Sequence, residues 1–128
     1  MKIALINHTP TWDAPGDWEE IRDQVLGFLD SGSLVTRGIE PSPDRHDPAA
    51  PPRVPVGFRT DGEWLWALGN AFYVRTYDQP IDPDLLEHIR AKGYHAAEVG
   101  RDVIGEALRV LEEAAKKYVA EEKLTKNP

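Results

Sequence analysis

The residues with the most distinctive chemistry surround a short motif in which Arg59, Trp64 and Trp66 stand close together and Tyr73 follows. On a β-hairpin the first three side chains would share one face, because side chains alternate between the two faces of a strand. A flat aromatic surface beside a cation can stack a base, a sugar or a partner's side chain. Trp, Tyr and Arg are also enriched in the hot spots of protein interfaces. The sequence therefore predicts a binding face at these four positions or, as the alternative, tryptophans that belong to the core.

A second candidate binding residue is Trp12, which lies in the proline-bounded segment at residues 9–15. Proline fixes the backbone and removes a hydrogen-bond donor, so this segment does not suit a long strand. A tryptophan on such a loop either covers the core or contacts a partner, and the sequence leaves both alternatives open.

Motifs for catalysis, metal binding and phosphate binding are missing from the sequence. The serines lie in predicted turns or loops, none stands in a G-x-S-x-G motif, and there is no cysteine. The four histidines lack metal-ligand spacing, and no phosphate-binding glycine motif occurs. We therefore assign no catalytic residue, no metal and no cofactor. The alternative is a small enzyme whose site is assembled in space from Arg59, His88 and a nearby carboxylate.

The charge balance bears on the class of partner. The chain has 128 residues, with 15 Lys and Arg against 22 Asp and Glu, and a formal net charge of −7. This charge disfavours nucleic acid and anionic membranes and suits a protein with a basic surface, because complementary fields speed encounter. No apolar run reaches the roughly 20 residues that a membrane span needs. The apolar run after Lys2 is also too short for a secretory signal, so we expect a soluble cytoplasmic protein.

The elements that would position the binding face begin with a β-hairpin over residues 54–68. The dipeptide Asp61-Gly62 is typical of a two-residue type I′ turn, and such a turn would place Gly57 opposite Trp66. The indole would then lie over the bare glycine backbone. Both faces of this hairpin carry large apolar side chains, so we expect other elements to cover it on both sides.

Helical spacing of apolar residues predicts most of the remaining elements, and the first six residues predict a short N-terminal strand. The first helix would begin at Asp17, which has capping-box spacing with Glu20, and Gly32 would end it in the left-handed conformation. Asn70 and Asp82 would cap the next two helices. The expected helices cover residues 17–30, 70–78, 83–92 and 97–122.

Proline density sets the domain organisation. Six prolines lie between residues 39 and 55, a density that excludes a helix or a central strand and predicts an extended loop or a linker. Residues 1–38 are too few to bury a core alone. We therefore expect residues 1–128 to form a single α+β domain, in which the hairpin packs with three to four helices.

Three segments resemble a recurring part of a group of uncharacterised actinobacterial proteins. They are the hairpin FRTDGEWLW at 58–66, the aromatics FYV at 72–74 and the helix LLEHIRAKGY at 85–94. The resemblance covers about 40 of the 128 residues, and Ala67 stands where the group has a proline. Some members look like small cytoplasmic partners of larger toxin-type or secreted proteins. The resemblance thus implies an immunity-like or adaptor role and carries over no catalytic residue.

These observations favour a non-catalytic protein that binds a partner protein through Arg59, Trp64 and Trp66. The alternatives are the small enzyme described above and a small-ligand or nucleotide binder that stacks its ligand on the tryptophans. The predicted last helix carries a wide apolar stripe, part of which could face a second copy of the chain. A homodimer through this helix is therefore a further expectation.

Overall fold

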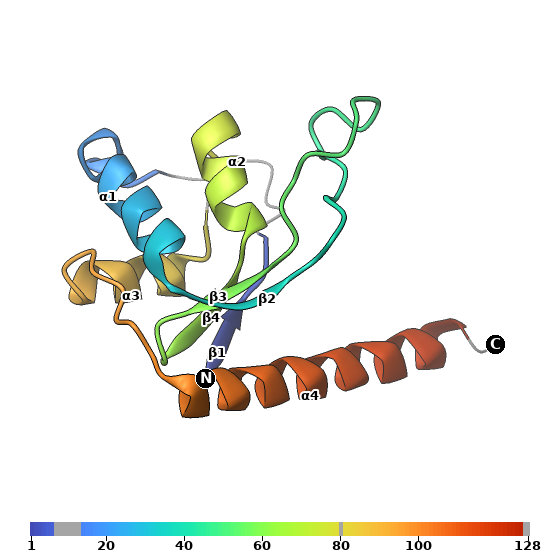
Figure 1. Ribbon diagram of the computed structural model, residues 1–128. Helices are drawn as coiled ribbons and strands as arrows, with labels where there is room; N and C mark the ends of the chain where they lie inside the picture. Colours follow the sequence, from blue (N-terminus) through green and yellow to red (C-terminus); the bar gives the residue numbers. More distant parts are fainter. Residues whose placement is uncertain (7–13, 80, 127–128) are drawn as a thin grey trace.

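The computed structural model shows an α+β fold and describes residues 1–6, 14–79 and 81–126, with side chains as far as residue 117 (Figure 1). The described elements are, in chain order, β1 (Lys2–Ala4), α1 (Trp18–Ser31), β2 (Ser33–Arg37), β3 (Gly57–Thr60), β4 (Trp64–Ala67), α2 (Gly69–Tyr77), α3 (Pro83–Ala91) and α4 (Arg101–Lys126). The four strands form one mixed sheet in the order β1-β4-β3-β2, in which β1 runs parallel to β4 and the other neighbours are antiparallel. The predicted fold class is confirmed.

The sheet lies between two layers of helix. Figure 1 shows α1, α2 and α3 on one face and α4 passing across the other. Strand β4 explains this arrangement, because its alternating side chains place Trp64 and Trp66 on one face and Leu65 on the other, and all three are buried. Cover on both faces is what the apolar pattern predicts. Among the described residues, none of the helices combines the length and the hydropathy that a bilayer crossing requires.

Strand β2 was missed by the sequence patterns. It begins just after α1 and pairs with β3, placing Leu34 opposite Arg59 and Arg37 opposite Gly57. The two strands are joined by the long segment 38–56. The sequence between them therefore has no tight-turn motif from which the pairing could be predicted. This strand adds an edge to the sheet on the side away from β1.

The hairpin of β3 and β4 has a different register from the predicted one. Thr60 pairs with Leu65 and Arg59 with Trp66, which shifts the pairing by two residues from that of a type I′ turn. The predicted pairing of Gly57 with Trp66 is therefore wrong. Because the shift is even, each side chain keeps its predicted face of the sheet.

Side chains at the turn explain the longer connection. The Asp61 carboxylate accepts the backbone N–H groups of Glu63 at 3.0 Å and Trp64 at 2.9 Å. The Thr60 hydroxyl donates to the Trp64 carbonyl at 2.7 Å and accepts the Gly62 N–H at 3.0 Å. Asp side chains commonly bind backbone groups two or three residues ahead, and here they close a wider loop than two residues would.

Of the predicted helix caps, one is confirmed and two are replaced by other contacts. The Asp82 carboxylate accepts the N–H of Asp84 at 2.8 Å, with a proline at the first helical position. Asp17 makes no side-chain cap and instead binds the Arg90 guanidinium at 2.8 and 3.0 Å, which joins α1 to α3. Asn70 lies inside α2, where its amide donates to a backbone carbonyl of β4 at 3.0 Å.

The prediction for Gly32 is also corrected. Its φ of −61° and ψ of 155° are extended, not left-handed. A Cβ built at Gly32 would lie 2.3 Å from the Trp66 indole, so the glycine beneath this ring is Gly32 and not Gly57. Gly57, with φ of 140°, instead lies against the Thr36 carbonyl.

The proline-rich segment is irregular, as predicted, and is attached to the rest of the structure. Ser42 and Val54 form an isolated β-bridge across it. Between them Asp44 is fully buried, and its carboxylate accepts hydrogen bonds from Arg53 at 2.7 Å and from the Tyr77 hydroxyl at 2.6 Å. Since Tyr77 belongs to α2, this cluster holds the segment against that helix.

Candidate functional site

The structure places both hairpin tryptophans in the core. Trp64 is 7 % exposed and Trp66 is 1 % exposed. The Trp66 indole N–H donates to the Leu29 carbonyl at 2.9 Å, and its ring centroid lies 5.2 Å from that of Phe28. Rings enclosed in this way do not present a surface on which a ligand could stack. These two positions thus follow the core alternative.

Tyr73 is buried as well, with 2 % of its surface exposed. Its hydroxyl accepts the backbone N–H of Arg45 at 3.1 Å, which adds a second attachment for the proline-rich segment. Trp12, the remaining aromatic candidate, lies outside the described residues.

Arg59 differs from the other predicted binding residues that the structure describes, because it lines a surface pocket. Its guanidinium donates to the Gly32 carbonyl at 2.8 Å, just beyond the C-terminal end of α1. Backbone carbonyls at this end of a helix lack intrahelical partners and carry partial negative charge, so a cation is favoured there. A guanidinium has five N–H donors, and one contact leaves most of them for a ligand.

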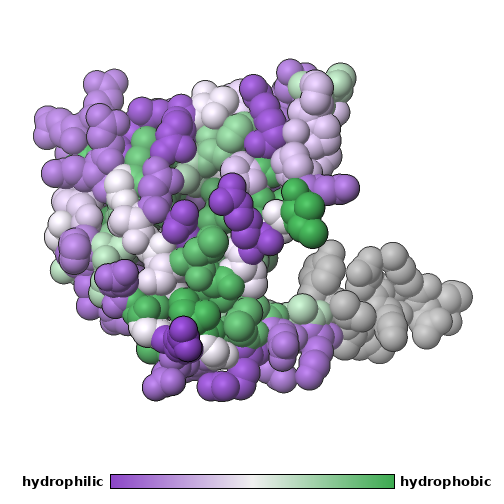
Figure 2. Space-filling view, viewed as in Figure 1, coloured by the Kyte–Doolittle hydropathy of each residue, from purple (hydrophilic) through white to green (hydrophobic). Residues whose placement is uncertain are grey.

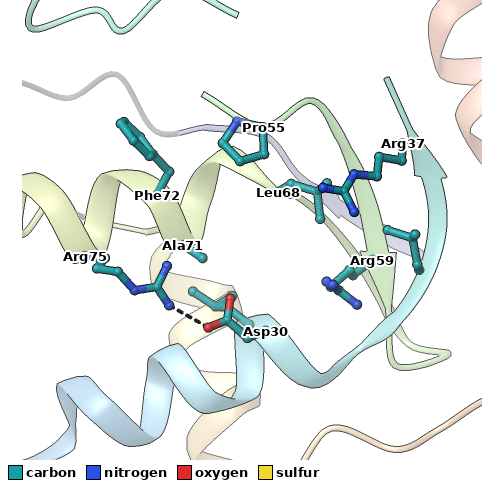
Figure 3. A pocket seen from close by; sticks show the side chains of 10 residues that line it. Asp30, Arg37, Pro55, Arg59, Leu68, Ala71, Phe72 and Arg75 are labelled. Carbon is teal, nitrogen blue, oxygen red and sulfur yellow. Dashed lines mark hydrogen bonds and ion pairs between the residues drawn. The ribbon is translucent and has the colours of Figure 1, made fainter. Parts of the chain in front are cut away.

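The pocket, which we call the arginine pocket, has a volume of about 200 Å³ and lies between the end of α1, helix α2 and strands β2 and β3 (Figure 3). Three arginines line it from three different elements, Arg37 on β2, Arg59 on β3 and Arg75 on α2. Leu34, Phe72 and other apolar side chains supply the rest of its wall. Cations and apolar surface are thus combined in one concavity.

The charges of the arginine pocket are only partly balanced. Asp30 binds the Arg75 guanidinium at 2.5 Å, and the side chains of this pair are about half exposed. Among the described residues, no carboxylate pairs with Arg37 or Arg59 in the structure. In a chain whose net charge is −7, three arginines around one carboxylate form a local excess of positive charge. An anion in the pocket would relieve their mutual repulsion.

Of these three arginines, only Arg59 was predicted from the sequence as a binding residue. Arg37 was missed because β2 was missed, and the pairing of β2 with β3 is what brings Arg37 into the same pocket as Arg59. Nothing in the sequence pointed to Arg75 as a binding residue, since an arginine near the end of a helix is common. Predicting strand β2 would have been the one way to find the pocket from the sequence.

A second polar cluster surrounds the hairpin turn. The His88 imidazole and the Asp61 carboxylate lie 2.6 Å apart, and the side chains are 12 % and 2 % exposed. Burial raises the pKa of Asp61, but hydrogen bonds from His88 and from the N–H groups of Trp64 and Glu63 outweigh it and hold the pKa below its usual value. A carboxylate only accepts hydrogen bonds, so His88 Nε2 carries the proton in this contact.

Asp61, Glu63 and His88 together offer three ligand atoms within 4.8 Å of one another, a spacing compatible with a metal ion. Each side chain is already engaged, because Asp61 binds His88 and Glu63 forms an ion pair with Lys92 at 2.7 Å. A metal would have to displace these contacts. The cluster is therefore best understood as the joint that fastens the hairpin turn to α3.

The enzyme alternative requires Arg59 and His88 to share a site. Arg59 lines the arginine pocket, whereas His88 is not among the residues that line it and is enclosed by Phe28 and Trp64, whose ring centroids both lie 6.1 Å from its own. The arginine pocket, being open, is the better candidate for function.

No family model matches the chain, and no curated protein or solved structure matches it either.

Proposed function

We propose that the protein is a non-catalytic binding protein that takes a carboxylate of a partner protein into the arginine pocket. The convergence of Arg37, Arg59 and Arg75 on one concavity carries this proposal. Guanidinium groups match carboxylate oxygens in geometry and form charge-assisted hydrogen bonds with them. The enzyme alternative has no comparable support, because the pocket lining holds cations and one paired carboxylate.

The size of the pocket favours a protein side chain over a whole metabolite. Sites for small molecules usually occupy about 300–1,000 Å³, whereas the arginine pocket has about 200 Å³. This volume suits one Asp or Glu side chain or a chain terminus. Leu34 and Phe72 in the wall favour an apolar residue next to that carboxylate.

The overall charge adds a requirement on the surroundings of that carboxylate. A net charge of −7 attracts basic surfaces over long range, while the arginine pocket attracts an anion at short range. A partner with an acidic residue inside a largely basic surface satisfies both. The partner thus still has the basic surface that the composition favours. On this chain, the arginine pocket takes the place of the tryptophan face as the recognition element.

Titration with short blocked peptides tests the proposal. The probes are acetyl-Leu-Glu-Leu-amide, its Gln analogue and inorganic phosphate, and binding is followed through the arginine side-chain signals in ¹H–¹⁵N NMR spectra. The Glu peptide should shift signals from the arginine pocket, and the Gln peptide should not. Arg37→Gln and Arg75→Gln should each weaken binding about tenfold or more, because hydrogen bonds to charged groups contribute about 1.5–3 kcal/mol.

The matched control is Arg101→Gln, which removes the same charge from the exposed first turn of α4. It should leave affinity unchanged. Equal weakening by Arg101→Gln would mean that the peptide binds through overall charge and not through the pocket. Tighter binding of phosphate than of the Glu peptide would contradict a protein ligand, and no response to either anion would rule out the pocket as a site.

A further inference from the structure

We propose that Asp30 occupies the arginine pocket in the free protein and that the partner replaces it by exchanging ion pairs. In this exchange the partner's carboxylate binds Arg75, and a basic side chain next to that carboxylate binds Asp30. The inference rests on the proposed function. It narrows the partner's segment to an acidic residue with a basic neighbour.

The structure already contains a carboxylate bound in the arginine pocket. Asp30 of α1 and Arg75 of α2 both line the pocket, and Arg75 Nη2 donates to Asp30 Oδ2 at 2.5 Å (Figure 3). The Asp30 side chain presents the same chemical group as the proposed ligand. A carboxylate that enters the pocket therefore has to compete with Asp30 for Arg75.

The position of Asp30 makes this ion pair easy to exchange. Asp30 lies in the last turn of α1, a turn that has no basic residue. The C-terminal end of a helix carries partial negative charge, so a carboxylate is disfavoured there. In the described part of the chain, Arg75 is the one side chain that binds Asp30, and both side chains are about half exposed. Ion pairs with this exposure are weak, because water screens them.

Displacement from Arg75 would leave Asp30 beside two sources of negative charge. One is the end of α1, and the other is the carboxylate that has taken Arg75. Arg59 already binds the Gly32 carbonyl at this end of the helix. A cation that enters with the ligand would remove the repulsion. A partner with an acidic residue inside a largely basic surface, which the net charge of −7 favours, carries such a cation near its carboxylate.

The surroundings of the ion pair suit a protein segment better than a free anion. Figure 2 shows hydrophilic and apolar surface side by side on the face where the end of α1 meets β2. Leu34 and Phe72 are part of the pocket wall. A peptide can supply a carboxylate, a cation and an apolar side chain in a fixed order, whereas phosphate brings no cation for Asp30.

Two blocked peptides test the exchange. Acetyl-Leu-Glu-Lys-amide carries the cation, and acetyl-Leu-Glu-norleucine-amide has the same side-chain carbons without the ammonium group. Their dissociation constants are measured from the arginine side-chain signals in ¹H–¹⁵N NMR spectra. The unaltered chain should bind the Lys peptide about threefold more tightly, the scale of a partly exposed ion pair. Asp30→Asn should abolish this preference. It should also bind the norleucine peptide about threefold more tightly than the unaltered chain does, because the internal competitor is gone.

Asp23→Asn is the matched control. The Asp23 side chain is 96 % exposed on the same helix and does not line the pocket. Seven residues separate it from Asp30, which is about 10 Å along the helix axis. The variant loses the same charge as Asp30→Asn, but it should keep the preference for the Lys peptide and the affinity for the norleucine peptide. The same spectra show that each variant is folded.

A preference for the Lys peptide that is absent from the unaltered chain, or that persists in Asp30→Asn, overturns the exchange. An unchanged affinity of Asp30→Asn for the norleucine peptide does so as well. In these cases the proposed function stands if the Glu peptides bind and acetyl-Leu-Gln-Lys-amide does not. Peptides that bind none of the proteins, or only Asp30→Asn, overturn the exchange and the proposed function together.

Discussion

The indole of Trp66 lies directly over Gly32, and a Cβ at position 32 would stand 2.3 Å from Cζ2 of the ring and 3.1 Å from the Thr60 carbonyl oxygen. The backbone of Gly32 is in an ordinary extended conformation that any residue adopts. Space, and not conformational freedom, is therefore what requires glycine here. The carbonyl of the same residue accepts a hydrogen bond from Arg59, so the packing of the core and the position of an arginine in the pocket both depend on Gly32.

Gly32→Ala should lower the free energy of unfolding by about 1–3 kcal/mol, the usual cost of adding a methyl group to a filled core. Urea unfolding followed by tryptophan fluorescence measures this change. Gly27→Ala is the matched control, because Gly27 lies in α1, where an added Cβ would have no atom within 4 Å other than those of its own chain neighbours and helix backbone. It should stabilise the protein by about 0.5–1 kcal/mol through its higher helix propensity. A Gly32→Ala protein as stable as the parent would contradict the close contact.

The second prediction concerns the joint between the hairpin turn and α3. Asp61→Ala removes the acceptor for two backbone N–H groups and for His88, and should cost about 2–4 kcal/mol of stability. Asp61→Asn keeps the side-chain carbonyl and should cost clearly less. Glu63→Gln breaks only the exposed pair with Lys92 and should cost less than about 1 kcal/mol. Thermal or urea unfolding of the three variants gives this order, and a Glu63→Gln effect equal to that of Asp61→Ala would count against it.

Stability should fall in acid, and the direction follows from three carboxyl groups. Hydrogen bonds from Arg90 lower the pKa of Asp17. Burial raises the pKa of Asp44, but hydrogen bonds from Tyr77 and Arg53 prevail and lower it, and the pKa of Asp61 is lowered in the corresponding way. In the unfolded chain these Asp pKa values are near 3.9. In the acidic pH range the unfolded chain therefore binds more protons than the folded chain, and stability falls as the pH falls.

The contribution of these carboxylates is therefore fully present above about pH 4–5 and is lost as pH falls through the lowered folded values. Urea midpoints measured between about pH 6 and pH 2 should decline toward the acid end. In Asp61→Asn the decline should be shallower, because one of the three groups no longer titrates. A midpoint that is constant from pH 5 to pH 2 would contradict the lowered pKa values.

The elements predicted correctly from the sequence are those specified by residues close together along the chain. The apolar stripe of α1 and the Asp82-Pro83 start of α3 each depend on residues within a few positions of one another. The prediction of the hairpin register was wrong because it relied on the Asp61-Gly62 dipeptide. It did not consider that the Asp61 side chain binds the following backbone N–H groups.

The candidate site was less predictable than the fold, for a physical reason. Arg37, Arg59 and Arg75 come from three elements whose approach depends on strand β2, and β2 is specified by pairing with a distant strand. The tryptophans show the converse difficulty. Tryptophan is found both on binding faces and in cores, so only the packing of α1 on the sheet decides that Trp66 is enclosed.

The proline-rich segment gives the last prediction. Asp44 accepts hydrogen bonds from Arg53, Tyr77 and the His46 backbone, and through Tyr77 it attaches the segment to α2. Asp44→Ala leaves these donors without their common acceptor, so the segment should open more often. Trypsin cleavage after Arg53 should then be about tenfold faster, because proteolysis follows the population of the open form. Asp47→Ala, which alters an exposed side chain in the same segment, should leave the rate unchanged. Equal rates for the two variants would mean that the bridge between Ser42 and Val54, and not the buried carboxylate, holds the segment in place.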